Sequence, residues 1–478
     1  MAKNESAFTH PIFAIILLGI LYLLFPSINP SGDTYTFANQ IKNGNELFLP
    51  HHLIYNAFYY VLSQVLSISD TLSFISFMNG IFAIGCLFFM NAILSKYTSN
   101  ATRFFTILFL GSCFGFMRYA TTGETYIVPL FFSLWASWCA ITKKPVILTA
   151  LIAGVSCLFH QIHIFWWLGL LIFSTISNYE KQWKNFLLYC LGSCIVPFTY
   201  LMVFYLTEHD ATNLFEYIAY DYIHNEDVEF TIKTKALILT PINFIRTFYQ
   251  VHGYIILLVQ KYWFVGIGIC LSVLFGIFGL IKLRKIKKRT NTKFFEIQFA
   301  FCHLLIFFLQ LLFAAISDGN AEFMVMLPFA LALFALIRYT FQHIPMYAFA
   351  LSILIWNISV GLIPYHILET TSDPALARYI KAHPDEVYYI KDRQIARESL
   401  KYHYPDRSFQ LYTIKENTTD LDSLLQEYSG LLSDILTQKA TSRSSMIEAE
   451  LPTSSYNIQK IDSVNYDLGA LVIARIEK

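Results

Sequence analysis

Long apolar segments alternate with short polar connections as far as residue 363, and this alternation limits the fold more than any other feature. A helix needs about 20 apolar residues to cross the hydrocarbon core of a membrane, so we predict a polytopic α-helical membrane protein with about 11 transmembrane helices. The first apolar run is longer than that of a signal peptide and is expected to stay uncleaved. The predicted spans are Pro11–Ile28, Thr71–Leu94, Phe104–Met117, Thr125–Ile141, Val146–Phe159, Ile164–Ile176, Phe186–Leu206, Tyr254–Ile281, Ile297–Ile316, Phe323–Tyr339 and Pro345–Ile363.

Basic residues concentrate in every second connection between these spans, and such residues favour the cytoplasmic side of a membrane. One set of connections holds Lys3, Lys96, Arg103, Lys143, Lys144, Lys181, Lys184, the basic segment 282–296 and Arg338. The other set holds only Lys42, Arg118, Lys233, Lys235 and Arg246. This bias predicts a cytoplasmic N-terminus, a basic cytoplasmic loop at 282–296, and outer loops at 29–70 and 207–253.

Two segments leave a second interpretation open. Residues 53–68 have the apolar spacing of a helix with a tyrosine stripe, which we interpret as a helix lying in the membrane interface. Residues Phe159–Trp167 interrupt a long apolar stretch, and we interpret them as a polar tip between two short helices. Either segment, taken as part of a full span, would reverse the topology and break the charge bias.

Residues 364–478 have the composition of a soluble protein, whereas only 14% of the whole chain is charged, against about 25% in soluble chains. Alternating patterns predict helices at 373–384, 393–404 and 418–439 and strands at 386–391, 409–414 and 470–477. We expect a small extracytoplasmic α/β domain after a membrane domain of residues 1–363. The net charge of +1 gives no support for nucleic acid as a partner. The basic cluster at 282–293 fits a solvated cytoplasmic anchor better than a nucleic-acid site.

The informative polar side chains all fall on the outer side of this topology. Ionisable groups near membrane depth are costly and usually functional, so we expect them to form one outer site. They are Asp33, His51 and His52 in the first loop, Arg118 and Glu124 in the second, His160, Gln161 and His163 in the third, Arg246 in the fourth, and Asp318 and Glu322 in the fifth.

In this layout the chain resembles the GT-C class of integral-membrane glycosyltransferases, which includes protein O-mannosyltransferases and aminoarabinose transferases. The matching features are "GD" at Gly32–Asp33, "PHHLIYN" at Pro50–Asn56, and an R-x-x-x-x-x-E-x-Y turn from Arg118 to Tyr126. A histidine-containing third tip and a soluble domain after the last span also match. The resemblance covers the whole chain, but this sequence has no second acid beside Asp33.

The resemblance implies an enzyme of a cell membrane, most often bacterial. It would move a sugar from a polyprenyl-phosphate carrier to a hydroxyl of a glycan, lipid or protein acceptor on the outer face. Asp33 would be the catalytic base or acceptor-activating group, with Glu124 as a second catalytic acid. Such a transfer needs a base on the incoming hydroxyl and cations or donors for the departing phosphate. Candidate substrate-binding residues are Arg118, His51, His52, His160, Gln161, His163, Glu322 and Arg246, with Arg118 favoured for phosphate because of its planar guanidinium.

Other interpretations of these residues remain. Asp33 could cap a short helix at 34–41. His160 and His163 could hold a divalent metal, although a buried hydrogen-bonding role is the more ordinary one, and no cofactor is firmly predicted. Asp318 and Glu322 could belong to a solvated turn. A glycan polymerase or ligase using a lipid diphosphate is the alternative enzyme, and a transporter or flippase of lipid-linked glycans is the alternative from another class.

Overall fold

The computed structural model describes residues 9–220, 223, 234–251, 253–283, 286–414, 419–440, 445–449 and 456–478. Lys3, Lys233, most of residues 221–233 of the predicted outer loop, and residues 284–285 of the basic loop lie outside the described residues. The chain forms two compact units. The first contains residues 1–26, 40–255 and 259–363, and the second contains residues 27–39, 256–258 and 364–478.

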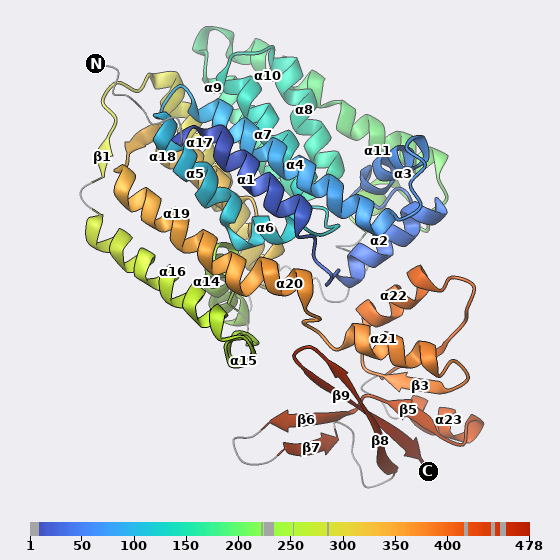
Figure 1. Cartoon of the computed structure of the whole chain (residues 1–478). Coiled ribbons are helices and arrows are strands. Elements are labelled where there is room, and N and C mark those ends of the chain that lie inside the picture. Colours follow the sequence, from blue (N-terminus) through green and yellow to red (C-terminus); the bar gives the residue numbers. More distant parts are fainter. Residues whose placement is uncertain are drawn as a thin grey trace. The chain divides into compact units, whose positions relative to one another are not determined.

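The first unit is built from helices lying alongside one another (Figure 1). The principal ones are α1 (Pro11–Leu24), α4 (Thr71–Leu94), α5 (Asn100–Ser112), α6 (Phe114–Ala120), α7 (Ile127–Ile141), α8 (Val146–Phe159), α9 (Ile164–Ile176), α10 (Gln182–Ser193), α11 (Ile195–Leu206), α14 (Thr234–Phe248), α16 (Trp263–Lys282), α17 (Phe294–Ile316), α18 (Leu327–Arg338) and α19 (His343–Asn357). Shorter elements of this unit are α3 (Tyr55–Val65), α12 (Leu214–Ile218), η2 (Gln161–His163), η3 (Tyr179–Lys181), η4 (Glu322–Met324) and η5 (Ile358–Leu362). Helices α2 (Gly32–Asn43) and α20 (Ile363–Ile367) lie mostly in the second unit, and α15 (Ile255–Lys261) contains residues of both.

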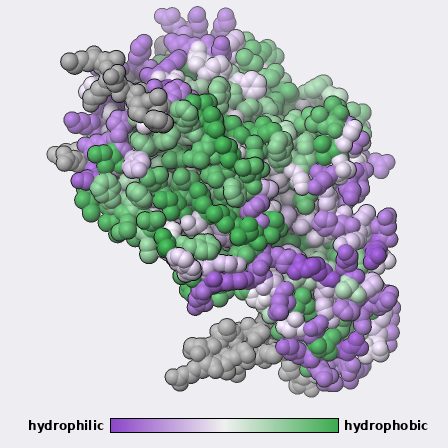
Figure 2. All heavy atoms as spheres, in the orientation of Figure 1, coloured by the Kyte–Doolittle hydropathy of each residue, from purple (hydrophilic) through white to green (hydrophobic). Residues whose placement is uncertain are grey.

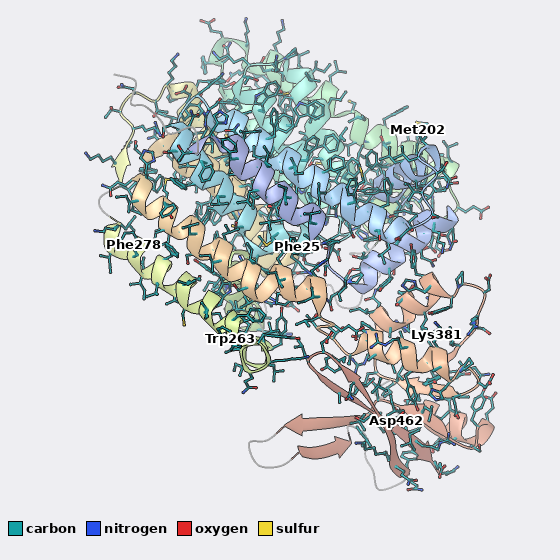
Figure 3. All side chains as sticks on the ribbon, in the orientation of Figure 1. Phe25, Met202, Trp263, Phe278, Lys381 and Asp462 are labelled. Carbon is teal, nitrogen blue, oxygen red and sulfur yellow. The ribbon has the colours of Figure 1, made fainter. Side chains whose placement is uncertain are left out.

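Five helical runs of the described residues are long and apolar enough to cross a membrane: Thr71–Leu94, Tyr179–Leu206, Trp263–Lys282, Phe294–Ile316 and His343–Ile367. Four shorter apolar helices occupy Pro11–Leu24, Ile127–Ile141, Val146–Phe159 and Gln161–Ile176. Their outward side chains are apolar, and Figure 2 shows hydrophobic residues gathered over this unit. Figure 3 labels two of them on α16, Trp263 and Phe278, which are 74% and 41% exposed. The prediction of a polytopic α-helical membrane protein with a small C-terminal α/β part is confirmed.

Several helices differ from the predicted spans. The segment Phe104–Met117 is divided into α5 and α6 at Cys113, where the backbone leaves the helical region. The stretch Phe159–Trp167 contains the predicted break, because His160 is extended between α8 and η2. Helix α3 has 11 residues, or about 16 Å, which is too short to cross a membrane. Helix α14, inside the outer loop 207–253, was not predicted.

The basic connection 282–296 is partly ordered by backbone pairing. Lys287 and Lys288 form β1, which pairs with β2 at Tyr339–Thr340. The Nε of Arg289 donates to the carbonyl oxygens of Leu336 and Tyr339, at 3.2 and 3.3 Å. Both lysines of β1 are exposed, as a solvated basic segment requires.

The second unit contains a five-stranded mixed sheet in the order β4-β3-β5-β9-β8. Its strands are β3 (Val387–Ile390), β4 (Gln410–Thr413), β5 (Leu431–Ser433), β8 (Asn457–Tyr466) and β9 (Gly469–Glu477), and β6 (Leu436–Ala440) and β7 (Ser445–Ala449) form a separate hairpin. Helices α21 (Asp373–Ala382) and α22 (Gln394–His403) cover one face of the sheet, and α23 (Thr419–Glu427) covers the other. The central strand β5 is parallel to β3 and antiparallel to β9.

The helix predicted at 418–439 is wrong beyond Glu427. The chain turns around Gly430, and Leu431–Ser433 become the central strand. Leu431 packs into one core of the unit and Leu432 into the other. Leucines on both sides of a buried strand are hard to distinguish from a helical pattern, which explains the error.

Candidate active site

A fully buried amide holds the turn of residues 121–125, the second of the predicted outer turns. Asn79 of α4 donates through Nδ2 to the carbonyl oxygens of Thr122 and Glu124, at 2.7 and 2.6 Å. Tyr59 of α3 donates to the Asn79 Oδ1 at 3.2 Å, and Tyr55 donates to the Gly123 carbonyl oxygen at 3.1 Å. The predicted interfacial helix thus holds the turn that carries Glu124.

Two carboxylates lie around a pair of tyrosines next to this turn. Tyr126 donates to the Glu322 Oε2 at 2.7 Å, and its ring lies 5.0 Å from that of Tyr119. Burial raises the pKa of Tyr119, and the carboxylates of Glu322 and Glu124 raise it further. Both acids therefore lie close to the Tyr119 phenol. Glu124 is only 7% exposed, so a base or acid is held here away from bulk solvent.

Three histidines continue the cluster from Tyr126. The ring of His160 lies 5.2 Å from that of Tyr126 and 4.3 Å from that of His52, and the ring of His51 lies 4.0 Å from that of His52. The Thr125 hydroxyl is 3.5 Å from the His52 Nε2. Side chains from the first, second, third and fifth of the predicted outer connections therefore meet at one place in the first unit.

Burial keeps the inner histidines neutral. It lowers the pKa of His52 and of His160 well below the usual value, and the neighbouring imidazoles lower each further. A neutral imidazole has one N–H donor and one acceptor nitrogen, so these rings are suited to bind hydroxyl groups or a phosphate oxygen through a single N–H. They are not suited to act as fixed positive charges.

Among the described residues no group of three or more His, Cys, Asp or Glu side chains is arranged to hold a metal ion. The histidine rings instead contact one another edge to face. His163 is not part of the cluster. Its Nδ1 forms a hydrogen bond with the Ser133 hydroxyl at 2.7 Å, which joins η2 to α7. We therefore derive no step through a metal.

Arg246 is the clearest cation for an anionic group. It lies on α14, which contacts α6 and η4. Its Nη1 donates to the Asn243 Oδ1 at 3.1 Å, and the Asn243 Nδ2 in turn donates to the carbonyl oxygen of Gly319, in the fifth of the predicted outer turns. The Arg246 Nε is buried and has no hydrogen-bond partner within the described residues. Arg118, in the last turn of α6, is partly exposed and close enough to Tyr119 to lower its pKa.

Gln161 has a role in joining loops. Its Nε2 lies within 3.0 Å of the Pro50 carbonyl oxygen, the Tyr200 hydroxyl and the Ile218 carbonyl oxygen. Its backbone N–H donates to the His51 carbonyl oxygen. Gln161 therefore connects the first, third and fourth of the predicted outer segments and keeps His51 and His160 in position.

Asp33 belongs to the second unit, in the first turn of α2. It does not cap this helix, because the Ser31 hydroxyl accepts the Thr34 N–H at 3.0 Å. The exposed Asp33 carboxylate accepts a hydrogen bond from the Gln394 amide at 3.0 Å. A Cβ on Gly32 would lie 2.5 Å from the Gln394 side chain, so the glycine of "GD" allows this approach. The capping interpretation of Asp33 is therefore wrong.

Sequence reasoning missed Asn79 and Tyr119. Asn79 is one of two amide side chains, with Asn91, within the mostly apolar segment Thr71–Leu94, and an amide in such a segment was the available signal. Tyr119 lies inside the R-x-x-x-x-x-E-x-Y turn but is not one of its named positions. Its role depends on Glu322, which is distant in sequence.

Comparisons with known proteins were made at three levels. No family model and no curated protein matches the chain. The structure is similar to that of ArnT from Cupriavidus metallidurans bound to undecaprenyl phosphate, with 11% identity over 99% of this chain and 98% of that chain and a TM-score of 0.45. The apo form of the same protein gives 12% identity over 97% and 96%, with a TM-score of 0.43. An oligosaccharyltransferase from Archaeoglobus fulgidus, in complex with zinc and sulfate, gives 10% identity over 89% and 67%, with a TM-score of 0.42.

Proposed function

We propose that this protein is a membrane glycosyltransferase that moves a sugar from a polyprenyl-phosphate donor to an acceptor hydroxyl on the outer face of a cell membrane. The observation that carries the proposal is the cluster of buried Glu124, Tyr126, His52 and His160 with half-buried Glu322, assembled from four of the predicted outer connections. The GT-C-like order of motifs in the sequence agrees with it. A bacterial membrane with a cytoplasmic N-terminus is part of the same proposal.

The reaction exchanges one C–O bond for another. The bond between the anomeric carbon and the phosphate oxygen breaks, its electron pair leaves with polyprenyl phosphate, and the acceptor oxygen bonds to the anomeric carbon through an oxocarbenium-like state. The acceptor hydroxyl loses its proton as this bond forms. Phosphate is a good leaving group, so the protein mainly has to supply a base and hydrogen-bond donors.

We assign the base to Asp33, whose exposed carboxylate is oriented by Gln394 and does not cap α2. Arg246, with its buried unpaired Nε, and Arg118 would bind the departing phosphate, since a guanidinium matches phosphate oxygens. Neutral His52 and His160 would donate to the sugar or phosphate, with His51 beside them. Glu124 and Glu322 would accept hydrogen bonds from sugar hydroxyls, and Gln161 and His163 would position the loops.

The test is sugar transfer by the purified protein in detergent, using a panel of radiolabelled polyprenyl-phosphate sugars. We expect Asp33→Asn to lower kcat about a hundredfold or more, as loss of a general base does. Glu124→Gln should lower kcat as well, because its carboxylate no longer accepts hydrogen bonds from the sugar hydroxyls. Arg246→Gln should instead raise the KM for the lipid donor. The control is Asp392→Asn, an exposed carboxylate at the start of α22 that pairs with Arg397. Full activity in Asp33→Asn would remove Asp33 from the mechanism.

The alternative enzyme class differs in its donor. A glycan polymerase or ligase would consume a lipid-diphosphate oligosaccharide and leave every monophosphate donor untouched. A transporter or flippase would move lipid-linked glycan between vesicle leaflets without breaking the sugar–phosphate bond. Either result in the same donor panel would overturn the proposed reaction.

A further inference from the structure

The end of the helical bundle opposite the candidate active site contains a basic cavity. Glu124 and Tyr126 lie before the start of α7, His160 lies after the end of α8, and Glu322 lies after the end of α17. The cavity is lined by residues at the other ends of these helices. Because α7 has 15 residues, the two places are about 22 Å apart along its axis.

The cavity has a volume of about 210 Å³ and is mixed in character. Lys143 and Lys144 of the α7–α8 turn supply positive charge, and Ser177, Asn178 and Asn185 supply hydroxyl and amide groups. Phe173 and Phe295 form part of an apolar wall. Charge, hydrogen-bonding groups and an apolar wall in one cavity suit a ligand with an anionic head and an apolar continuation.

Aromatic rings hold the two lysines in place, and no carboxylate of the described residues neutralises their charge. The Lys143 ammonium lies 4.8 Å from the centre of the Phe295 ring, and that of Lys144 lies 5.5 Å from the centre of the Trp138 ring. Neither lysine forms an ion pair within the described residues. The nearby Glu296 is engaged elsewhere, since it accepts the Lys293 backbone N–H at 2.9 Å and pairs with Tyr97. Both charges are therefore available to an anion.

Lys143 also occupies a backbone position that disfavours it. Its φ is 58°, in the left-handed region where glycine normally ends a helix. A lysine there costs conformational energy that glycine or asparagine would avoid. A residue that only ended the helix would not need a charged side chain. Lys143 instead contacts the Phe295 ring and lines the cavity, which explains a lysine at this position.

We propose that this cavity binds the phosphodiester headgroup of an anionic membrane phospholipid. The ammonium groups would contact the phosphate, the serine and asparagine side chains would contact headgroup hydroxyls, and the apolar wall would face the start of the acyl chains. The site is independent of the proposed glycosyl transfer and would exist in a protein of any other activity. A free phosphate ester shares the headgroup chemistry, so the test separates the two sources.

The experiment is native mass spectrometry of the full-length protein released from detergent, with dioleoylphosphatidylglycerol as the probe and dioleoylphosphatidylcholine as the neutral comparison. We expect phosphatidylglycerol to be retained preferentially. The double variant Lys143→Asn and Lys144→Gln should lower its affinity about tenfold or more, since each lysine near a membrane surface contributes roughly a fivefold factor. Asparagine tolerates the left-handed conformation, so this variant keeps the turn intact.

The matched control removes the same charge from the same end of the bundle. Lys181 of η3 and Lys184 of α10 do not line the cavity, and Lys181→Gln with Lys184→Gln should change retention less than twofold. A filling variant, Ser177→Phe, should reduce retention although both lysines remain. Asn178→Trp tests the same point at an exposed position of the cavity lining. Equal loss in both lysine pairs, or retention in the filled variants, would overturn the proposal. Displacement of the lipid by millimolar sn-glycerol 3-phosphate would reassign the site to a soluble ester.

Discussion

Asn79 illustrates how one buried amide controls a turn that is more than 40 residues away in sequence. Its two N–H groups and its oxygen are all used, and all three partners are buried around the turn that carries Glu124. A replacement without these atoms removes the Asn79 donor from the Thr122 carbonyl oxygen and the Asn79 acceptor from the Tyr59 hydroxyl. It leaves the Glu124 carbonyl oxygen only its 3.4 Å hydrogen bond from the Tyr55 hydroxyl. An unpaired buried polar group costs about 1–3 kcal/mol.

We therefore expect Asn79→Leu to destabilise the protein by about 3 kcal/mol or more, measured as a lower thermal midpoint in detergent. The control is Asn91→Leu on the same helix, because the Asn91 Oδ1 is buried without a partner within the described residues. Removing that group should be neutral or stabilising. Equal destabilisation by both variants would show that Asn79 contributes packing rather than hydrogen bonds.

His52 and His160 make stability depend on pH. Their folded-state pKa values lie below the unfolded value because burial disfavours the imidazolium. The unfolded chain therefore binds more protons below about pH 6.5, so the stability is fully present above that pH and is lost as the pH falls. Each of these two histidines therefore lowers the free energy of unfolding at pH 5 relative to pH 7.

The measurement is the thermal midpoint between pH 7 and pH 5, which should fall in the wild type and fall less in His160→Gln. His383→Gln is the comparison, since His383 is exposed in the second unit, and it should keep the full pH dependence. A wild-type midpoint that does not change over this range would show that the cluster accepts protons in the folded state.

At the scale of elements, Arg393 ties three parts of the second unit together. Its Nε pairs with Asp434, just after β5, at 2.7 Å, and its Nη1 contacts Ser372 and Asp373 at the start of α21. The Asp434 side chain is fully buried, and its Oδ1 also accepts the Lys391 N–H at 2.8 Å. Breaking a buried pair leaves an uncompensated charge at a cost of about 3–5 kcal/mol.

Arg393→Met should therefore speed amide hydrogen exchange in β5 and the start of α22 by about a hundredfold. Adding Asp434→Leu should restore most of the protection, because the buried charge is then gone. Arg378→Met is the matched control, since Arg378 pairs with Glu369 at the surface and an exposed pair contributes about 1 kcal/mol or less. No rescue by Asp434→Leu would point to a packing role for Arg393.

The elements that sequence could predict are those with a long, regular pattern. Spans such as Thr71–Leu94 and the helices at α21 and α22 follow from apolar periodicity and from clear polar boundaries. The helix at 418–439 failed because Leu431 and Leu432 face opposite cores, a fact that only the sheet order reveals. In the site, His52, Glu124 and Glu322 could be named from loop positions, but their grouping depends on Tyr119, Tyr126 and Asn79, whose contacts cross long sequence distances.

At the scale of the whole molecule, the residues of the carboxylate–histidine cluster and a set of lysines lie at opposite ends of the same helices. The acids, tyrosines and histidines lie at the starts of α7 and α9 and the ends of α8 and α17, whereas Lys143, Lys144 and Lys181 lie at the other ends. Basic connections favour the cytoplasm. The candidate active site should therefore face outward, where a polyprenyl-phosphate sugar presented on the outer leaflet would reach it.

This orientation is tested by fusing alkaline phosphatase, which is active only outside the cytoplasm, or green fluorescent protein, which fluoresces inside it, to successive positions. We expect fluorescence for fusions after Asn178 and Asn291 and phosphatase activity for fusions after Asp210 and Lys478. The paired reporters control each other at every site. Phosphatase activity after Asn291 would place the basic segment outside, against the charge bias. It would also turn the carboxylate–histidine cluster toward the cytoplasm, where nucleotide-activated sugars would become the donors to test.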